Sequence, residues 1–173
     1  MDTEILKGKK VLVVDDEPDV IETLVEALDM CRTESALDFS SARRMLRRNH
    51  YDGAVLDIMG VNGYGLLEVA IENKIPAVIL TAHALSADNF KKAVRGGAHA
   101  YLPKDKMFEI PEYLAELITS GRGRDKKSGR WFTKLSPYYD NNFGSDWKKG
   151  DPEFWHDFKD IFKFSREELE DVL

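Results

Sequence analysis

Short apolar runs alternate with segments of helical periodicity over residues 10–120, and this alternation limits the possible folds more than any other feature. Three runs have no polar face, as is typical of strands buried on both sides of a sheet: 10–15, 53–57 and 76–81. Two weaker strand candidates lie at 32–38 and 99–102. The segments between the runs carry apolar residues at spacings that favour helices with one buried face. We therefore expect five consecutive β-α units.

Strands that alternate with helices predict an α/β fold, in which helices cover both faces of a doubly wound parallel sheet. Right-handed crossovers leave few topologies, and the default order for five strands is 2-1-3-4-5. We predict that residues 1–121 form this domain.

The composition changes after residue 121. Residues 122–130 are polar and contain glycine, which predicts a linker. The last 52 residues hold 11 of the 18 aromatic residues, including all three tryptophans. Over 131–173 we predict a short, mainly helical, aromatic-rich extension, with a helix starting at Asp151-Pro152 and a capping box formed by Ser165 and Glu168. It carries an apolar stripe that could dock on the first domain, mediate a homodimer or bind a partner's groove: Phe154, Trp155, Phe158, Ile161 and Phe162.

Composition disfavours several classes of protein. The lone cysteine, Cys31, cannot form an intrachain disulfide and favours a reducing compartment. No apolar run approaches the ~20 residues that span a bilayer, and residues 1–4 do not resemble the start of a signal peptide. We therefore expect a cytoplasmic chain without a membrane partner. The net charge is −6, and residues 122–173 hold 11 basic and 11 acidic residues, so the charge disfavours nucleic-acid binding.

The side chains that could carry chemistry follow the predicted strands. Asp15 and Asp16 come after the first strand, Asp57 after the third, Thr81 ends the fourth and Lys104 follows the fifth. In a doubly wound sheet, ligands bind at the carboxyl ends of the strands, and the first and third strands are neighbours in the expected order. The three carboxylates should therefore meet, flanked by one hydroxyl and one ammonium group.

Three clustered carboxylates favour a bound cation, because they cannot all stay ionised without one. Oxygen ligands without thiolates or imidazoles indicate Mg²⁺ or a similar ion. A Mg²⁺ site with few protein ligands keeps positions open for phosphate oxygens. Lysine and threonine can stabilise the charge of a transferred phosphoryl group, and a carboxylate can itself be the nucleophile. The residues therefore predict phosphoryl transfer to an aspartate.

These residues stand in segments that resemble the receiver domain of a two-component response regulator over residues 9–120. The matching segments are Val11-Leu-Val-Val-Asp-Asp-Glu17, Ala54-Val-Leu-Asp-Ile-Met59, Ile79-Leu-Thr-Ala82 and Gly97-Ala-His-Ala-Tyr-Leu-Pro-Lys104. The resemblance implies a flavodoxin-like fold. It also implies that Asp57 accepts a phosphoryl group from a histidine kinase or a histidine phosphotransfer protein. It implies a signalling protein rather than an enzyme that turns over an external substrate.

The resemblance also implies individual roles. Asp15, Asp16 and Asp57 would hold Mg²⁺ together with the backbone carbonyl of Met59. Thr81 and Lys104 would contact the phosphoryl group. Tyr101 would change rotamer as Thr81 moves, although a half-buried edge aromatic is an alternative reading of this residue. Phosphorylation would then change the face formed by the fourth helix, the fifth strand and the fifth helix.

Two departures from the family pattern and two rival functions remain open. The loop from Asp57 to Gly63 is shorter than the family pattern and lacks its proline, so we expect it to follow its own path beside the metal. Pro103 precedes Lys104, whereas the family has a proline after the lysine. The rivals are a transcriptional response regulator with an unrecognised DNA-binding tail, and a scaffold that acts independently of phosphorylation.

Overall fold

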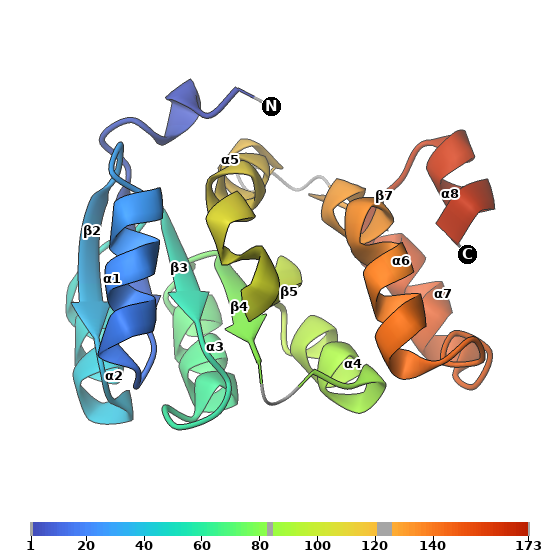
Figure 1. Ribbon diagram of the computed structural model, residues 1–173, viewed down its shortest axis with the longest axis horizontal. Helices are drawn as coiled ribbons and strands as arrows, with labels where there is room; N and C mark the ends of the chain where they lie inside the picture. Colours follow the sequence, from blue (N-terminus) through green and yellow to red (C-terminus); the bar gives the residue numbers. More distant parts are fainter. Residues whose placement is uncertain (1, 83–84, 121–125, 173) are drawn as a thin grey trace.

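The computed structural model describes residues 2–82, 85–120 and 126–172, and its centre is a five-stranded parallel sheet (Figure 1). The strand order is β2-β1-β3-β4-β5, as predicted. The strands are β1 (Lys10–Val14), β2 (Arg32–Ala36), β3 (Gly53–Leu56), β4 (Ala77–Thr81) and β5 (Ala100–Pro103). The three strands predicted as fully apolar, β1, β3 and β4, are the inner strands, which neighbouring strands flank on both sides.

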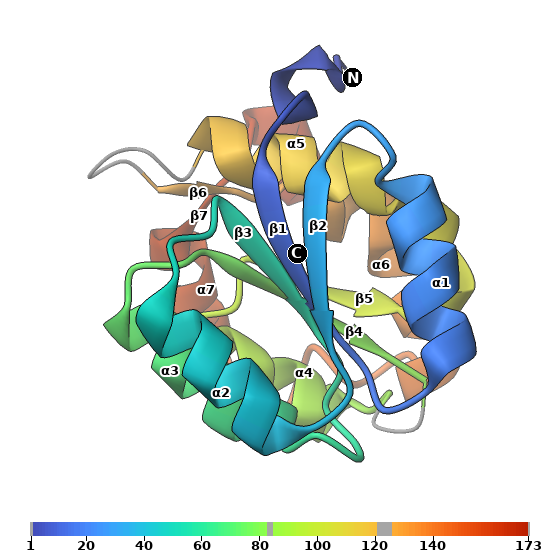
Figure 2. The same cartoon turned by 90° about the vertical axis from the view of Figure 1, so that its left-hand side faces the viewer.

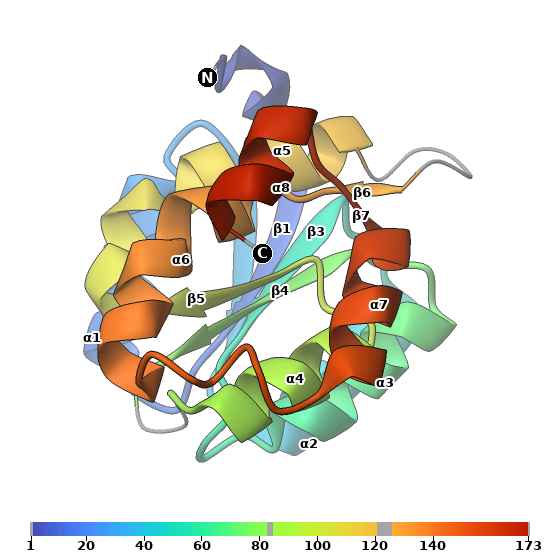
Figure 3. The ribbon, with the colours of Figure 1, turned by 90° about the vertical axis from the view of Figure 1, so that its right-hand side faces the viewer.

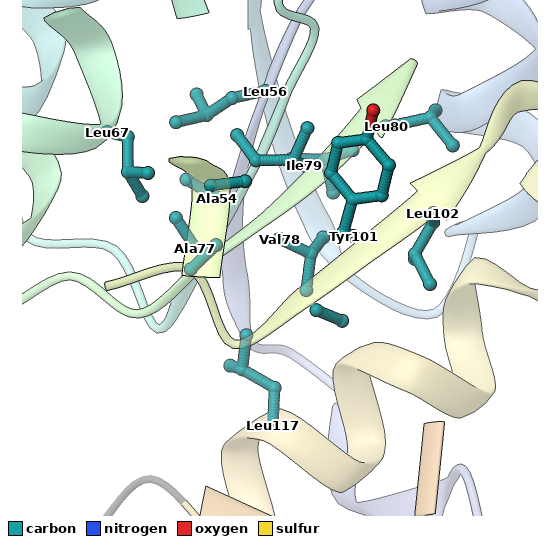
Figure 4. Close-up of a cluster of buried hydrophobic side chains, with 14 of the residues drawn as sticks. Ala54, Leu56, Leu67, Ala77, Val78, Ile79, Leu80, Tyr101, Leu102 and Leu117 are labelled. Atoms are coloured by element: carbon teal, nitrogen blue, oxygen red, sulfur yellow. The ribbon is translucent and has the colours of Figure 1, made fainter. Parts of the chain in front are cut away.

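Helices cover both faces of the sheet. Figure 2 shows α1 (Pro18–Ala27) and α5 (Ile110–Ser120) on one face, and α2 (Phe39–Arg48), α3 (Gly63–Glu72) and α4 (Ala87–Arg95) on the other. Two 3-10 helices complete this part, η1 (Glu4–Leu6) and η2 (Lys104–Glu109). Figure 4 shows the core, in which side chains of β3, β4 and β5 lie between Leu67 of α3 and Leu117 of α5. This is the predicted doubly wound α/β architecture.

The register of the sheet places the candidate site. Val14 pairs with Leu56, so Asp15 and Asp57 both emerge at the carboxyl ends of adjacent strands. Thr81 pairs with Pro103, which brings the end of β4 beside the residue that precedes Lys104. The predicted juxtaposition of strand ends therefore follows from the pairing.

The C-terminal extension contains α6 (Arg130–Phe143), α7 (Pro152–Ile161) and α8 (Arg166–Val172), together with β6 (Lys127–Ser128) and β7 (Phe162–Lys163), which pair in parallel. In Figure 3 the extension lies over β5, α4 and α5. The α7 stripe faces inward. Phe154, Trp155, Phe158 and Phe162 are buried, and the ring of Phe154 lies 6.2 Å from that of Phe90 on α4. We predicted that the stripe could dock on the first domain, mediate a homodimer or bind a partner's groove. The structure shows that it docks on the first domain.

Polar contacts fix the extension at the same face. Arg95 of α4 pairs with Asp151, the residue that caps α7, at 3.0 Å. Lys127 Nζ donates to the Gly97 carbonyl at 2.7 Å, and the backbone N–H of Trp131 donates to Glu116 of α5 at 3.3 Å. The extension therefore contacts α4, α5 and the turn before β5.

The structure differs from the sequence analysis in three places within the predicted linker and the extension. The residues predicted as a linker include β6 at Lys127–Ser128, and residues 122–125 lie outside the described part of the chain. Neither α6 nor the β6–β7 pair was predicted. Pro137 inside α6 obscures the helix signal, because proline cannot donate a helical hydrogen bond. The capping box of α8 is present as predicted, with Ser165 and Glu168 each accepting the other's backbone N–H.

No helix among the described residues combines the length and the apolar character that crossing a membrane requires.

Candidate functional site

Two buried carboxylates meet where β1 and β3 end. Asp15 is 1% exposed and Asp57 is 4% exposed. Each has one oxygen held by a nearby backbone N–H: Asp15 Oδ1 accepts from Glu17 at 3.0 Å, and Asp57 Oδ1 accepts from Ile58 at 2.9 Å. The other oxygen of each carboxylate, Oδ2, contacts the same ammonium group.

That ammonium group belongs to Lys104, the first residue of η2, which is 7% exposed. Its Nζ lies 2.8 Å from Asp15 Oδ2, 3.1 Å from Glu17 Oε1 and 3.5 Å from Asp57 Oδ2. Burial disfavours the charged ammonium, but the surrounding carboxylates outweigh burial, so the pKa of Lys104 is raised above its ordinary value. Lys104 therefore stays charged and links the ends of β1 and β3.

The surroundings of Asp57 disfavour the ionised form of its side chain. Burial and the negative charge of Asp15 raise the pKa of Asp57 from 3.8 to about 6, while Lys104 and the Ile58 N–H oppose this rise. A further positive charge close to Asp57 would favour its ionised form.

Asp15, Asp16 and Glu17 each offer an oxygen within 4.8 Å of the others, which makes this run a candidate metal cluster among the described residues. Asp57 is not part of that group and joins it through Lys104. Glu17 was not predicted as a site residue. Its position directly after two aspartates, before the proline that opens α1, was the available signal.

The shortened loop after Asp57 closes tightly on the site. Gly60 has a φ of +82°, and a Cβ there would lie 2.2 Å from Asp16 Oδ2. A Cβ at Gly63 would lie 1.9 Å from the backbone oxygen of Asp57, so no side chain fits there without movement of the loop. Met59 precedes Gly60, so its carbonyl belongs to the part of the loop beside Asp16, while its side chain is exposed. The loop therefore lies close against Asp16 and the backbone of Asp57, and it needs glycine at both positions.

Thr81 ends β4, which pairs with β3, and Tyr101 lies on β5, which pairs with β4. Thr81 is completely buried at the carboxyl end of β4. Tyr101 is also completely buried, so it is not the half-buried edge aromatic of the alternative reading; its ring meets Phe90 edge to face at 5.6 Å. Burial raises the pKa of the Tyr101 phenol. The carbonyl of Tyr101 accepts a hydrogen bond from Tyr139 of the extension.

The fold and this acidic group of strand-end residues define a receiver of two-component signalling. Residues 11–115 match the response regulator receiver domain family, and the chain belongs to that family. Its sheet order and flanking helices are those of receiver structures. The C-terminal extension lies beyond the matched residues.

Individual relatives agree with this assignment. The two-component response regulator ARR18 of Arabidopsis thaliana is 32% identical over 136 residues, covering 75% of this chain and 20% of that protein. The transcriptional regulatory protein PrrA of Mycobacterium tuberculosis is 33% identical over 143 residues, covering 79% of this chain and 58% of that protein. The receiver domain of Francisella response regulator 1452 superposes with a TM-score of 0.59 at 26% identity, covering 65% of this chain and 98% of that one. The matches thus cover less than two thirds of either curated relative.

The raised pKa of Asp57 predicts that removing its charge stabilises the protein. Without divalent cations at pH 7, Asp57→Asn should raise the free energy of unfolding by about 2–3 kcal/mol, because each pKa unit corresponds to about 1.4 kcal/mol and the net rise in the pKa already includes the favourable Lys104 contact. Since the folded-state pKa is the higher one, the penalty is full above pH 6 and absent below about pH 4. Urea unfolding of both proteins at pH 7 and below about pH 4 measures this gain in stability. An equal gain at the two pH values would contradict the raised pKa of Asp57.

Proposed function

We propose that this chain is a phosphoacceptor of a two-component phosphorelay, phosphorylated on Asp57 in the presence of Mg²⁺. The observation that supports this most is the pair of contacts made by Lys104, whose Nζ lies 3.5 Å from Asp57 Oδ2 and 2.8 Å from Asp15 Oδ2. A buried carboxylate beside a buried ammonium group is suited to receive a phosphoryl group, because the added negative charge gains a partner already in place.

In the proposed reaction, Asp57 Oδ2 attacks the phosphorus atom of the donor. The new oxygen–phosphorus bond forms as the bond to the donor breaks, and the donor leaves with the electron pair. The Ile58 N–H holds the other carboxylate oxygen, which fixes the orientation of the nucleophile. Lys104 and the Thr81 hydroxyl, at the ends of neighbouring segments, would contact the transferred group. Tyr101 would respond to movement of Thr81.

The donor set fits Mg²⁺. The carboxylates of Asp15, Glu17 and Asp57 contact the Lys104 ammonium group, Asp16 lies beside Asp15 and Glu17, and all the donors are oxygen atoms. We propose that Asp15, Asp16 and Asp57 hold the ion with the Met59 carbonyl, and Glu17 is available beside them. When bound, Mg²⁺ would offset the excess negative charge and stabilise the phosphoryl oxygens.

Receiver domains of response regulators interact with histidine kinases or histidine phosphotransfer proteins, and we propose one of these as the donor. They are usually not enzymes that act on external substrates, so the proposed activity is limited to accepting the group and promoting its removal. The single cysteine supports a cytoplasmic setting.

The structure gives no support to a DNA-binding tail. The aromatic side chains of the extension that could stack on bases are largely buried, including Trp131, Phe132 and Trp155. A homodimer through the α7 stripe is not proposed either, because the stripe is buried within the chain.

The experiment that tests the proposal is intact-mass analysis after incubation with acetyl phosphate, with and without Mg²⁺. We expect one added phosphoryl group per chain, and none when the ion is removed by a chelator. Failure to label with acetyl phosphate and with a histidine phosphotransfer donor would refute the phosphoacceptor proposal and favour the phosphorylation-independent scaffold.

Gly60 offers a specific test of the metal site. Gly60→Ala and Gly144→Ala should each cost about 1–3 kcal/mol in stability, because both glycines have a positive φ, +82° and +88°, and the ψ of Gly144, 156°, adds to the strain of any side chain there. Only Gly60→Ala should weaken Mg²⁺ binding, by about tenfold, because the new methyl group must displace the Asp16 carboxylate. A Cβ at Gly144 meets nothing within 4 Å, which makes it the matched control. Calorimetric titration with Mg²⁺ measures the affinity of each variant for the ion. Equal affinity in both variants would show that Asp16 does not bind the ion.

A further inference from the structure

Helix α6 of the extension contacts residues 101–105, the segment that carries Lys104. Two adjacent tyrosines of α6 contact this segment on either side of the lysine. Tyr139 donates its hydroxyl hydrogen bond to the carbonyl of Tyr101, and Tyr138 donates to Asp105 Oδ2 at 3.0 Å. The two contacts therefore lie on either side of Lys104, which links Asp15 to Asp57.

A second pair of contacts fixes the far end of the same segment. Lys134, also on α6, pairs with Glu109 at 2.6 Å and with Glu112 at 2.9 Å. Glu109 is the last residue of η2, and Glu112 lies in the first turn of α5. One helix of the extension thus contacts the carboxyl end of β5, the start of η2 and its end.

The aromatic packing of the extension fixes the position of Tyr139. Its ring stacks on Phe143 at 5.5 Å and on Phe132 at 6.0 Å, and it meets Phe90 at 5.2 Å. Tyr139 is completely buried, whereas Tyr138 is only partly buried. The hydroxyl on the Tyr101 carbonyl is therefore part of a packed core and cannot move independently of it.

We propose that the extension positions Lys104, with Tyr138 and Tyr139 as positioning residues, so that docking of the extension and phosphorylation of Asp57 affect each other. This rests on the proposed phosphorylation. A phosphoryl group on Asp57 Oδ2 would draw the Lys104 ammonium away from Asp15 and Glu17, its nearer partners at 2.8 and 3.1 Å. Such a movement displaces the backbone between Tyr101 and Asp105, where the two tyrosines bind. Coupling between two sites is reciprocal, so docking must in turn alter the stability of the phosphorylated state.

The test uses the full chain and compares Tyr138→Phe, the double variant Tyr138→Phe with Tyr139→Phe, and the control Tyr51→Phe. Tyr51 is a buried tyrosine whose hydroxyl bonds to Glu34 of β2, an edge strand at the opposite side of the sheet from β5. Each protein is phosphorylated with acetyl phosphate and Mg²⁺, the donor is removed, and intact mass follows the decay of the phosphorylated form. Hydrogen exchange of the α6 amides is measured before and after phosphorylation.

We expect the lifetime of the phosphorylated form to change by at least about threefold in Tyr138→Phe, the factor that corresponds to one net hydrogen bond, and by more in the double variant. Tyr51→Phe should match the wild type. Phosphorylation should alter exchange in α6 of the wild type. Asp105→Asn keeps an acceptor oxygen for Tyr138 and should also match the wild type, whereas Asp105→Leu should resemble Tyr138→Phe.

Labelling with unchanged lifetimes in both tyrosine variants, and with unchanged α6 exchange, would overturn the coupling alone. No labelling of the wild type would overturn the proposed phosphorylation and the coupling with it. If the double variant does not fold, Tyr138→Phe still decides, because its partly exposed hydroxyl can be removed without opening the core.

Discussion

Asp57→Asn should accept no phosphoryl group from a donor that labels the wild-type chain completely. The amide nitrogen and oxygen of asparagine are poor nucleophiles, so the acyl phosphate cannot form. The fold should remain intact, because asparagine has nearly the same shape and its oxygen can still accept from the Ile58 N–H, a bond of 2.9 Å in the wild type.

Asp52→Asn provides the matched control for this loss. Asp52 lies just before β3, at the opposite end of the strand from Asp57, and its Oδ2 accepts from the backbone N–H of Lys10 at 2.9 Å. Both aspartates flank the same strand, but only one lies beside Lys104. The Asp52 variant should label as the wild type does. Labelling of the Asp57 variant to the wild-type extent would show that another residue accepts the phosphoryl group.

Phe90→Ala should lower the free energy of unfolding by about 3–5 kcal/mol, the usual cost of removing a fully buried phenylalanine. Phe90 belongs to α4, yet its ring contacts both parts of the chain. It lies 5.6 Å from Tyr101 of β5, 5.2 Å from Tyr139 of α6 and 5.2 Å from Trp147. The alanine variant would leave a cavity where the extension meets the sheet.

Urea unfolding measures this cost with two signals. Tryptophan fluorescence reports on the extension, because all three tryptophans lie there, and far-ultraviolet circular dichroism reports on the whole chain. Phe108→Ala is the control; its side chain is 75% exposed, and the variant should stay within about 0.5 kcal/mol of the wild type. A Phe90 variant as stable as the wild type would contradict the packing described for the extension.

The sheet could be predicted because its inner strands are apolar throughout. Burial on both faces leaves a signal in the composition of each strand, as in Val11–Val14 of β1. The strand order followed from the general handedness of β-α-β crossovers. The weak edge strand β2 has exposed residues, yet it pairs along its whole length with β1, so the neighbouring strand stabilises it more than its own propensity does.

The extension could be predicted only in part, because periodicity identifies an apolar face without identifying what covers it. The α7 stripe was visible, but its partner, the face that carries Phe90, was not. Helix α6 escaped prediction because Pro137 and β-favouring aromatics lower its intrinsic propensity, and tertiary packing overrides that propensity. The same reasoning applies to β6 and β7, two-residue strands that only their mutual pairing defines.

In the candidate site, the strand ends could be predicted but the contacts between side chains could not. Adjacent strands had to bring Asp15 and Asp57 together, and the register shows that they do. The choice of Glu17 as a partner of Lys104 depends on the start of α1, and the closeness of Gly60 to Asp16 depends on the short loop. Such features arise from backbone paths that no residue pattern specifies.

The most direct measurement of the central claim is the position of the phosphoryl group. Wild-type protein labelled with acetyl phosphate and Mg²⁺ would be treated with borohydride, which reduces an acyl phosphate to an alcohol, and then digested for peptide mass spectrometry. We predict reduction at Asp57 alone, with Asp15 and Asp16 unmodified. Reduction at another carboxylate, or labelling that survives as a hydroxyl or imidazole phosphate, would contradict the assignment of Asp57 as the phosphoacceptor.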